Sequence, residues 1–147
     1  MNLFGMLLFL ITLQLHNPMG FDQDKTTHHF VLTASGGYID VTVHDASDQK
    51  NLSAIREHLT YIAVKFKDGD FNIPMLVHGQ LPPGTEIMKR SKGRIDYQFK
   101  VMERGGRVTI TTNHRGALQA IHEFIRYQIQ EHNTGDSLTV PKPLIAA

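Results

Sequence analysis

Residues 28–43 read HHFVLTASGGYIDVTV, and this stretch decides the fold class. From Phe30 onward apolar and polar side chains alternate, and the alternation resumes at Ile39 after the step Gly36-Gly37. An alternation of period two is typical of a strand that buries one face, and a glycine pair between two such runs predicts a hairpin turn. We therefore expect two antiparallel strands that bury the same face.

A helical pattern follows this hairpin. Its apolar residues recur at spacings of three and four, the stripe of an amphipathic helix: Leu52, Ile55, Leu59, Ile62 and Phe66. The acidic stretch 45–48 supplies residues that cap helix starts, and Gly69 suits a helix end. Residues 28–70 therefore predict a ββα unit.

The same order of patterns returns in residues 95–136. Gly105-Gly106 takes the place of the first glycine pair, and Thr112-Asn113 is the expected cap of a second helical stripe. In that stripe Ile125 takes the place of Leu59. We predict an α+β fold in which duplicated ββα units form a four-stranded antiparallel sheet with two main helices on one face.

The other segments complete the expected organisation of the chain. Residues 1–18 are an apolar N-terminal segment, and residues 19–137 form a single α+β domain. The linker 71–94 is expected to begin irregularly and to contain a short helix at 85–92, because a proline-rich turn precedes that helix. Residues 138–147, which contain two prolines, are expected to form a loose tail.

The N-terminal segment predicts export. Residues 1–20 contain no Lys, Arg, Asp or Glu, and the apolar run Leu3–Leu15 is too short to span a bilayer but suits the core of a signal peptide. A periplasmic or secreted protein without a transmembrane span in its mature chain is therefore expected. No basic residue precedes the run, so a cytoplasmic protein whose N-terminal segment packs on the domain is the alternative.

The composition excludes several kinds of chemistry. The chain has no cysteine, which excludes disulfides, thiolate nucleophiles and cysteine-based metal sites. Its net charge of +1 and dispersed basic residues argue against nucleic acid as a partner. Nine histidines leave imidazole as the main soft ligand and the main acid or base near neutral pH.

Four histidines are candidate ligands for copper or zinc: His28, His29, His78 and His132. His28 and His29 are neighbours on a predicted strand, so their side chains should lie on opposite faces of the sheet. His132 lies on the apolar stripe of the second helix, where the first unit has Phe66. Its position at a helix C-terminus predicts a raised pKa, and capping of the last helical carbonyls is the simpler alternative.

The catalytic candidates are weaker. Asp70 and Asp136 each follow a glycine that ends a helix, and they could form an acid–base pair if the two units bring them together; His78 and His132 are the other candidates. An aspartate after a glycine more often shapes a turn. The nucleophile elbow, the phosphate-binding loop and the dinucleotide-binding glycine motif are all missing from the sequence. The sequence therefore favours binding over turnover.

One face of the predicted sheet should remain open. Its residues are polar or mixed: His29, Val31, Thr33, Tyr38, Asp40, Thr42, His44, Asp96, Gln98, Arg107, Thr109 and Thr111. A solvated face explains this composition most simply. The face could also bind a protein partner or a second copy of the chain.

Several short motifs give the chain a resemblance to known proteins. They are Met19-Gly20-Phe21, Lys25-Thr26-Thr27-His28-His29-Phe30, Gly36-Gly37, Ile55-Arg56-Glu57-His58-Leu59, Gly69-Asp70-Phe71, Pro82-Pro83-Gly84, Gly105-Gly106-Arg107, Ile121-His122-Glu123-Phe124 and His132-Asn133-Thr134-Gly135-Asp136. Over about residues 19–137 the chain resembles a group of small exported bacterial proteins of uncharacterised function. Such chains are sometimes labelled aspartate carbamoyltransferase, but the Ser-Thr-Arg-Thr and His-Pro-x-Gln motifs of that enzyme are missing here. The resemblance implies export and a single domain, and it implies no catalytic residue.

Three functions therefore remain open from the sequence. The first is a small exported protein that binds a ligand or a protein partner. The second is a copper- or zinc-binding protein that uses histidine ligands. The third is a hydrolase or transferase with a site made of histidine and aspartate.

Overall fold

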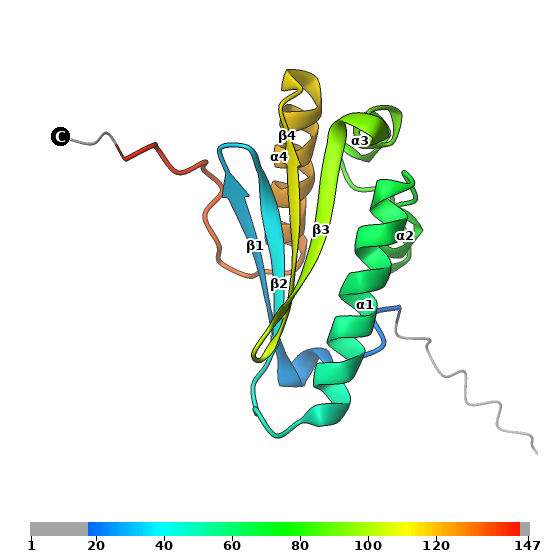
Figure 1. The fold of residues 1–147 in the computed structure, drawn as a ribbon, viewed down its shortest axis with the longest axis vertical. Helices are drawn as coiled ribbons and strands as arrows, with labels where there is room; N and C mark the ends of the chain where they lie inside the picture. The colour runs from blue at the N-terminus through cyan, green and yellow to red at the C-terminus, as the bar shows by residue number, and fades with distance from the viewer. Residues whose placement is uncertain (1–17, 145–147) are drawn as a thin grey trace, which may run out of the picture.

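Four strands pair into one antiparallel sheet in the computed structural model, which describes residues 18–144 (Figure 1). They are β1 (Thr26–Thr33), β2 (Gly36–Val43), β3 (Ile95–Met102) and β4 (Gly105–Thr112), in the spatial order β1-β2-β4-β3. The predicted α+β class and four-stranded antiparallel sheet are therefore confirmed. The predicted signal segment falls almost wholly outside the described residues.

The glycine pairs do not form the hairpin turns, which corrects one detail of the prediction. Two residues before each pair make the turn, and Gly36 and Gly105 are the first residues of β2 and β4. A Cβ on Gly36 would lie 1.9 Å from the Ile110 carbonyl oxygen, and one on Gly105 would lie 1.8 Å from that of Val41. These glycines are needed because the backbones of β2 and β4 approach each other too closely for a side chain.

Two long helices follow the hairpins. Helix α1 (Gln49–Lys67) begins as predicted, since the Asp48 carboxylate accepts a hydrogen bond from the Asn51 N–H at 3.1 Å. Helix α4 (Arg115–Glu131) begins differently from the prediction. Its N-cap is His114, whose Nδ1 accepts from the Ala117 N–H at 3.2 Å. The predicted cap residue Thr112 instead accepts a hydrogen bond from the His114 N–H.

The linker is more ordered than predicted. Its first part forms a helix, α2 (Asn72–His78), where an irregular segment was expected. Pro74 stands in the first turn of α2, where a missing N–H costs no helical hydrogen bond. The predicted short helix is present as α3 (Thr85–Arg90), and short 3-10 helices precede β1 (η1, Gln23–Lys25) and β3 (η2, Lys92–Arg94).

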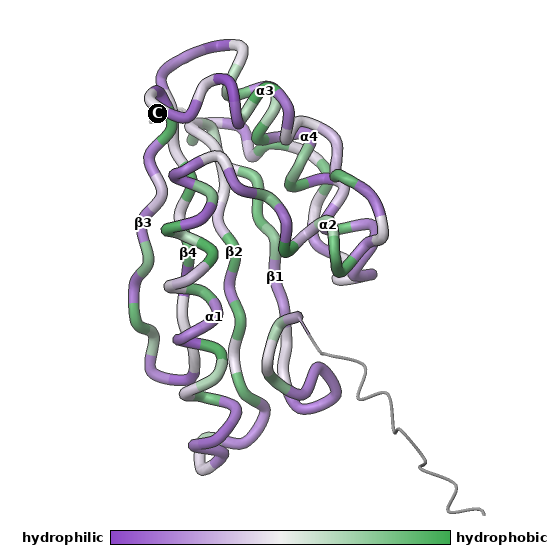
Figure 2. The backbone as a smooth tube through the Cα atoms, turned by 90° about the vertical axis from the view of Figure 1, so that its right-hand side faces the viewer, coloured by the Kyte–Doolittle hydropathy of each residue, from purple (hydrophilic) through white to green (hydrophobic). Residues whose placement is uncertain are grey.

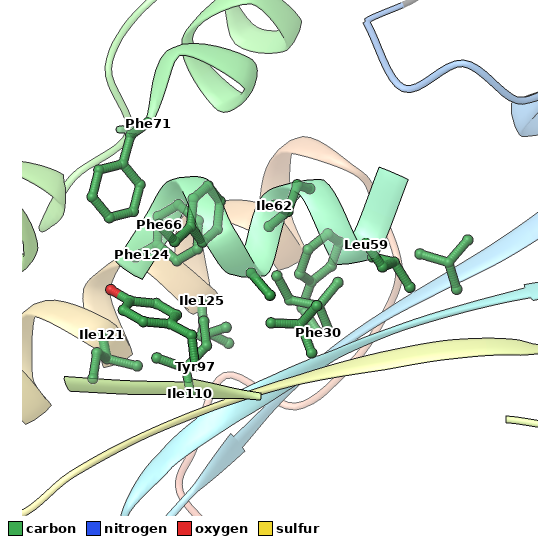
Figure 3. Packing of buried hydrophobic residues seen from close by; sticks show 14 of the residues in the cluster. Phe30, Leu59, Ile62, Phe66, Phe71, Tyr97, Ile110, Ile121, Phe124 and Ile125 are labelled. Atoms are coloured by element: carbon green, nitrogen blue, oxygen red, sulfur yellow. The ribbon is translucent and has the colours of Figure 1, made fainter. Parts of the chain in front are cut away.

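Side chains of α1 and α4 meet the sheet from the same side in Figure 3. Ile125 of α4 approaches the bare backbone of Gly37, and Leu59 of α1 approaches that of Gly106. An aromatic cluster joins the two helices to the start of the linker, with a Phe66–Phe71 ring-centroid distance of 4.7 Å. The chain thus runs ββα twice, while a common origin of its halves stays a prediction. Within residues 18–144, no helix combines the length and apolar character needed to cross a bilayer.

The close contact between α3 and α4 gives a test of this packing. Gly84 and Gly79 both have positive φ, 85° and 73°, but only at Gly84 would a Cβ clash, 2.2 Å from the Ala120 carbonyl oxygen. Gly79→Ala should lower the free energy of unfolding by about 1 kcal/mol, the cost of the left-handed backbone. Gly84→Ala should lower the free energy of unfolding by about 1–3 kcal/mol more than Gly79→Ala does, because α3 must also move away from α4. Urea denaturation of both variants measures the difference, and equal losses would contradict the contact.

Candidate functional site

A small cavity lies on the helix side of β1 and β2, between α1, α4 and α2. Its volume is about 40 Å³. Four histidines line it: His28, His58, His78 and His132. The rest of the lining is apolar except for Gln128: Met19, Phe30, Ile39, Val41, Leu59, Ile62, Phe66, Ile73, Pro74, Val77 and Phe124. We call this site the histidine pocket; several of its apolar residues are drawn in Figure 3.

Each histidine reaches the pocket from a different element. His28 lies on the buried face of β1, two residues before Phe30. His58 lies on α1, one residue before the buried Leu59. His78 is the last residue of α2, and His132 is the C-cap of α4. The pocket therefore depends on the packing of three helices against β1 and β2.

The rings form a continuous aromatic cluster. The His28 and His132 centroids are 5.3 Å apart with nearly parallel planes, and His78 meets His132 edge-on at 5.1 Å. Phe30 packs against His132 at 5.0 Å, and Phe21 lies 5.5 Å from His58. These contacts hold the half-buried imidazoles against one another and against phenylalanine rings.

The histidines differ in their hydrogen bonds. His78 Nε2 donates to Gln128 Oε1 at 2.8 Å, which places its proton on Nε2. No hydrogen bond between described residues uses a ring nitrogen of His28, His58 or His132. Each neutral imidazole offers one donor and one acceptor. The pocket therefore presents unused donors and acceptors inside an apolar lining.

Burial keeps the imidazoles of His28, His58 and His132 uncharged. Burial, with smaller contributions from His132, His58 and His29, lowers the pKa of His28 to about 4. Burial alone lowers the pKa of His58 to about 4. For His132, burial and then His78 give a pKa of about 4, which contradicts the raised pKa predicted from its place at a helix C-terminus. The loss of hydration outweighs the helix dipole here.

Three of the four predicted metal ligands come together in the pocket, and the fourth does not. His28, His78 and His132 line the same cavity, whereas His29 lies on the opposite face of the sheet as predicted. Among residues 18–144, no group of three or more histidine or carboxylate side chains is positioned to hold a metal ion. Metal binding would therefore require the imidazoles to change their side-chain conformations.

His29 instead pairs with a catalytic candidate from the sequence. Its Nδ1 lies 2.9 Å from Asp136 Oδ1, and the other carboxylate oxygen accepts the Phe30 N–H at 3.0 Å. Burial opposes a charge on Asp136, but hydrogen bonds from Thr134, His29 and Phe30 outweigh it and lower the pKa of that carboxyl. The His29 side chain is 49% exposed, so this pair ties the C-terminal segment to β1 and lies outside the histidine pocket.

The predicted pair of aspartates does not form. Asp70 accepts the Asn72 N–H at 3.0 Å and lies 4.0 Å from Lys65 Nζ, while Asp136 binds His29 and β1. Asp70 therefore shapes the turn before α2.

The open face carries a strong ion pair at its centre. Arg107 on β4 donates two hydrogen bonds of 2.6 Å to the Asp40 carboxylate on β2. Its guanidinium also lies 3.8 Å from the Tyr38 ring centroid. Asp40 is only 9% exposed because these neighbours cover it. The arginine is therefore used within the fold.

One pocket residue, His58, was missed by the sequence analysis. The signal that could have found it is the match between the two units, which places His58 opposite Phe124, a core residue. The same match places Gln128 opposite Ile62 and His132 opposite Phe66. Polar residues thus replace apolar ones at core positions around one cavity.

Comparison of the chain with models of protein families, with curated proteins and with solved structures finds no match.

The depressed pKa values predict a loss of stability in acid. His28 and His58 have pKa values of about 4 in the fold and 6.5 when unfolded, so the unfolded chain binds protons first as the pH falls. The free energy of unfolding should be highest above pH 6.5 and should decrease as the pH falls to about 4. The decrease is about 3 kcal/mol for one independent histidine. Urea denaturation across this range measures the fall.

Two variants separate this effect from the titration of carboxylates. His58→Leu removes one buried group and should flatten the decline, while His44→Gln, at an exposed position, should leave it unchanged. Parallel declines in all three proteins would show that the buried imidazoles do not cause the loss.

Proposed function

We propose that this chain is a small ligand-binding protein and that the histidine pocket is its binding site. The observation that carries the proposal is that three uncharged imidazoles, those of His28, His58 and His132, have no hydrogen bonds to described residues at a cavity whose lining is otherwise almost entirely apolar. Apolar walls with a few convergent polar groups are the usual composition of small-molecule sites. The binding energy would come from the apolar walls and the orientation from the imidazoles.

The chemistry of the pocket selects the ligand class. Charged imidazoles would attract anions, but the pKa values of about 4 keep His28, His58 and His132 neutral at physiological pH. The matching ligand is therefore a small uncharged molecule with an apolar, preferably aromatic body and one or two hydrogen-bonding groups.

A ligand of this kind needs more room than the cavity offers. A volume of about 40 Å³ accommodates only one or two water molecules. Helix α2 is the cover most easily displaced, because Pro74 is its only buried residue and Leu76 is 64% exposed. Ligand entry would therefore move α2 and leave the sheet and the long helices in place.

Titration with neutral aromatic probes tests the proposal. Indole, which carries one donor, and benzimidazole, which carries a donor and an acceptor, should shift the imidazole NMR signals of the pocket histidines in a saturable way. The exposed His44 should not respond. His132→Phe keeps an aromatic ring but removes the nitrogens, so it should weaken binding about tenfold if one hydrogen bond is lost.

His44→Gln is the matched control and should bind both probes as the unmodified chain does. Shifts that are linear in probe concentration, or equal at His44 and in the pocket, would overturn the proposal.

A second candidate function is the binding of copper or zinc. It is supported by the position of His28, His78 and His132, which line one cavity from three separate elements. Because burial keeps His28 and His132 neutral, a metal ion need not displace protons to bind their lone pairs. The geometry of the described residues argues against metal binding, because no three histidine or carboxylate side chains among them converge on one point.

Uptake of Cu(II) or Zn(II) by the purified chain tests the metal candidate. One ion per chain should bind at neutral pH, and His28→Ala with His132→Ala should abolish this uptake. His29→Ala, on the other face of the sheet, is the control and should retain it. No uptake by the unmodified chain would end the metal candidate and leave the small-molecule proposal standing.

We also propose that the protein is exported. The support is the apolar, uncharged segment at residues 1–18, which lies almost wholly outside the described residues. N-terminal sequencing of the protein recovered from the periplasm or the medium would show whether that segment is removed.

A protein partner or a second copy on the open sheet face stays part of the proposal. The polar composition of the open face and the Tyr38 ring on it support such a contact. The Asp40–Arg107 pair leaves little unpaired charge at its centre.

A further inference from the structure

The two edges of the sheet differ, although the two halves of the chain have the same order of elements. The outer edge of β1 is covered by the segment after α4. Asp136 accepts the Phe30 N–H at 3.0 Å, and the Leu138 carbonyl accepts from Arg126 Nε at 2.9 Å. Val140 packs partly against the core. The C-terminal segment thus lies against β1 and binds one of its backbone groups, the Phe30 N–H.

The outer edge of β3 has no such cover. Between described residues, no hydrogen bond outside the ladder to β4 uses a backbone group of residues 96–101. Figure 2 shows β3 at one margin of the sheet with no helix or strand on its outer side. Unpaired backbone groups on an edge strand are a template for pairing with another strand.

We propose that β3 pairs with β3 of a second copy of this chain. The two strands would run antiparallel about a two-fold axis at Gln98, and the two sheets would become one continuous sheet. This contact lies at the edge opposite β1, so it does not depend on the histidine pocket or on the function proposed for it.

Charge complementarity on the open face supports this register. Asp96, Gln98 and Lys100 point to the open face and are exposed. A two-fold axis at Gln98 places Asp96 of each copy opposite Lys100 of the other. Neither residue forms an ion pair with another described residue. Cross-strand pairs of opposite charge stabilise a sheet.

A carboxylate beside Lys100 would also relieve a repulsion within the sheet. Across the ladder it lies opposite Arg107, a like charge whose carboxylate partner is Asp40. Like charges directly opposite each other destabilise a strand pair. Asp96 of a second copy would offset this repulsion.

The apolar side of β3 matches in the same register. Its residues on the helix side become less buried along the strand, from Ile95 at 6% exposed to Val101 at 57%. The axis at Gln98 places Val101 opposite Ile95 of the other copy and Phe99 opposite Tyr97. A shift of one residue would bring charged side chains to this face, so the pattern favours the register in which charges and apolar groups both match.

Charge reversal tests the contact through the oligomeric state of the full chain. Sedimentation velocity should find a dimer for the unmodified chain. Asp96→Lys or Lys100→Asp alone places like charges opposite each other twice, and each should raise the dimer dissociation constant about tenfold or more. The double variant D96K/K100D restores both pairs and should recover the dimer. An equimolar mixture of the two single variants should form a mixed dimer.

A monomer for the unmodified chain at millimolar concentration would overturn the proposal. So would a dimer that the single reversals do not weaken, or one that the double variant does not restore. Far-UV circular dichroism of each variant establishes that the fold is retained.

The absence of cysteine allows a second, independent test. Gln98→Cys places one thiol at the proposed axis, where the two Cα atoms would be close enough for a disulfide. Mild oxidation should link this variant into a covalent dimer. Val31→Cys, on the open face of the covered strand β1, is the matched control and should remain monomeric under the same oxidation. Equal linking of both variants, or linking of Val31→Cys alone, would contradict the proposed edge.

Discussion

The fold depends on how closely the helices and strands approach at four glycines. Gly37 and Gly106 face the helices, and their lack of a side chain lets Ile125 and Leu59 rest directly on the sheet. Gly36 and Gly105 allow β2 and β4 to approach at the centre of the sheet. Because these contacts set the height of α1 and α4 above the strands, they also set the dimensions of the histidine pocket. Packed interiors tolerate little change in such distances.

The features predicted correctly from the sequence are those with a strong local period. The alternation around Phe30 and Ile39 and the stripe of α1 each reflect burial of a single face, which one stretch of chain can show. The predicted N-cap of α4 was wrong because His114, Thr112 and Asn113 can all accept a hydrogen bond from a backbone N–H. The packing decides which of them does so. Helix α2 was missed because Pro74 and a short apolar run give no helical period.

The site was only partly predictable, for a different reason. Three of its histidines were candidate metal ligands, and one of them, His132, could be selected because it interrupts an apolar stripe. Their approach to one cavity, however, depends on the angles at which α1, α2 and α4 pack. His58 was missed because it lies at the flank of its apolar stripe in a helical projection. The pKa of His132 was predicted wrongly for the same reason, because it depends on tertiary packing. A helix terminus is visible in the sequence, whereas the burial that outweighs it arises only from Phe30 and the neighbouring rings.

The hydrogen bond from the Phe30 N–H to Asp136 has a consequence for assembly. A sheet built from two similar hairpins has two similar edges, and a chain that could pair at both would grow without limit into a fibre. With the β1 edge partly blocked by its own C-terminal segment, each chain offers the β3 edge for pairing. Pairing at that edge uses it up in both copies, so growth stops at a closed, symmetric pair. A single carboxylate thus helps to separate finite association from polymerisation.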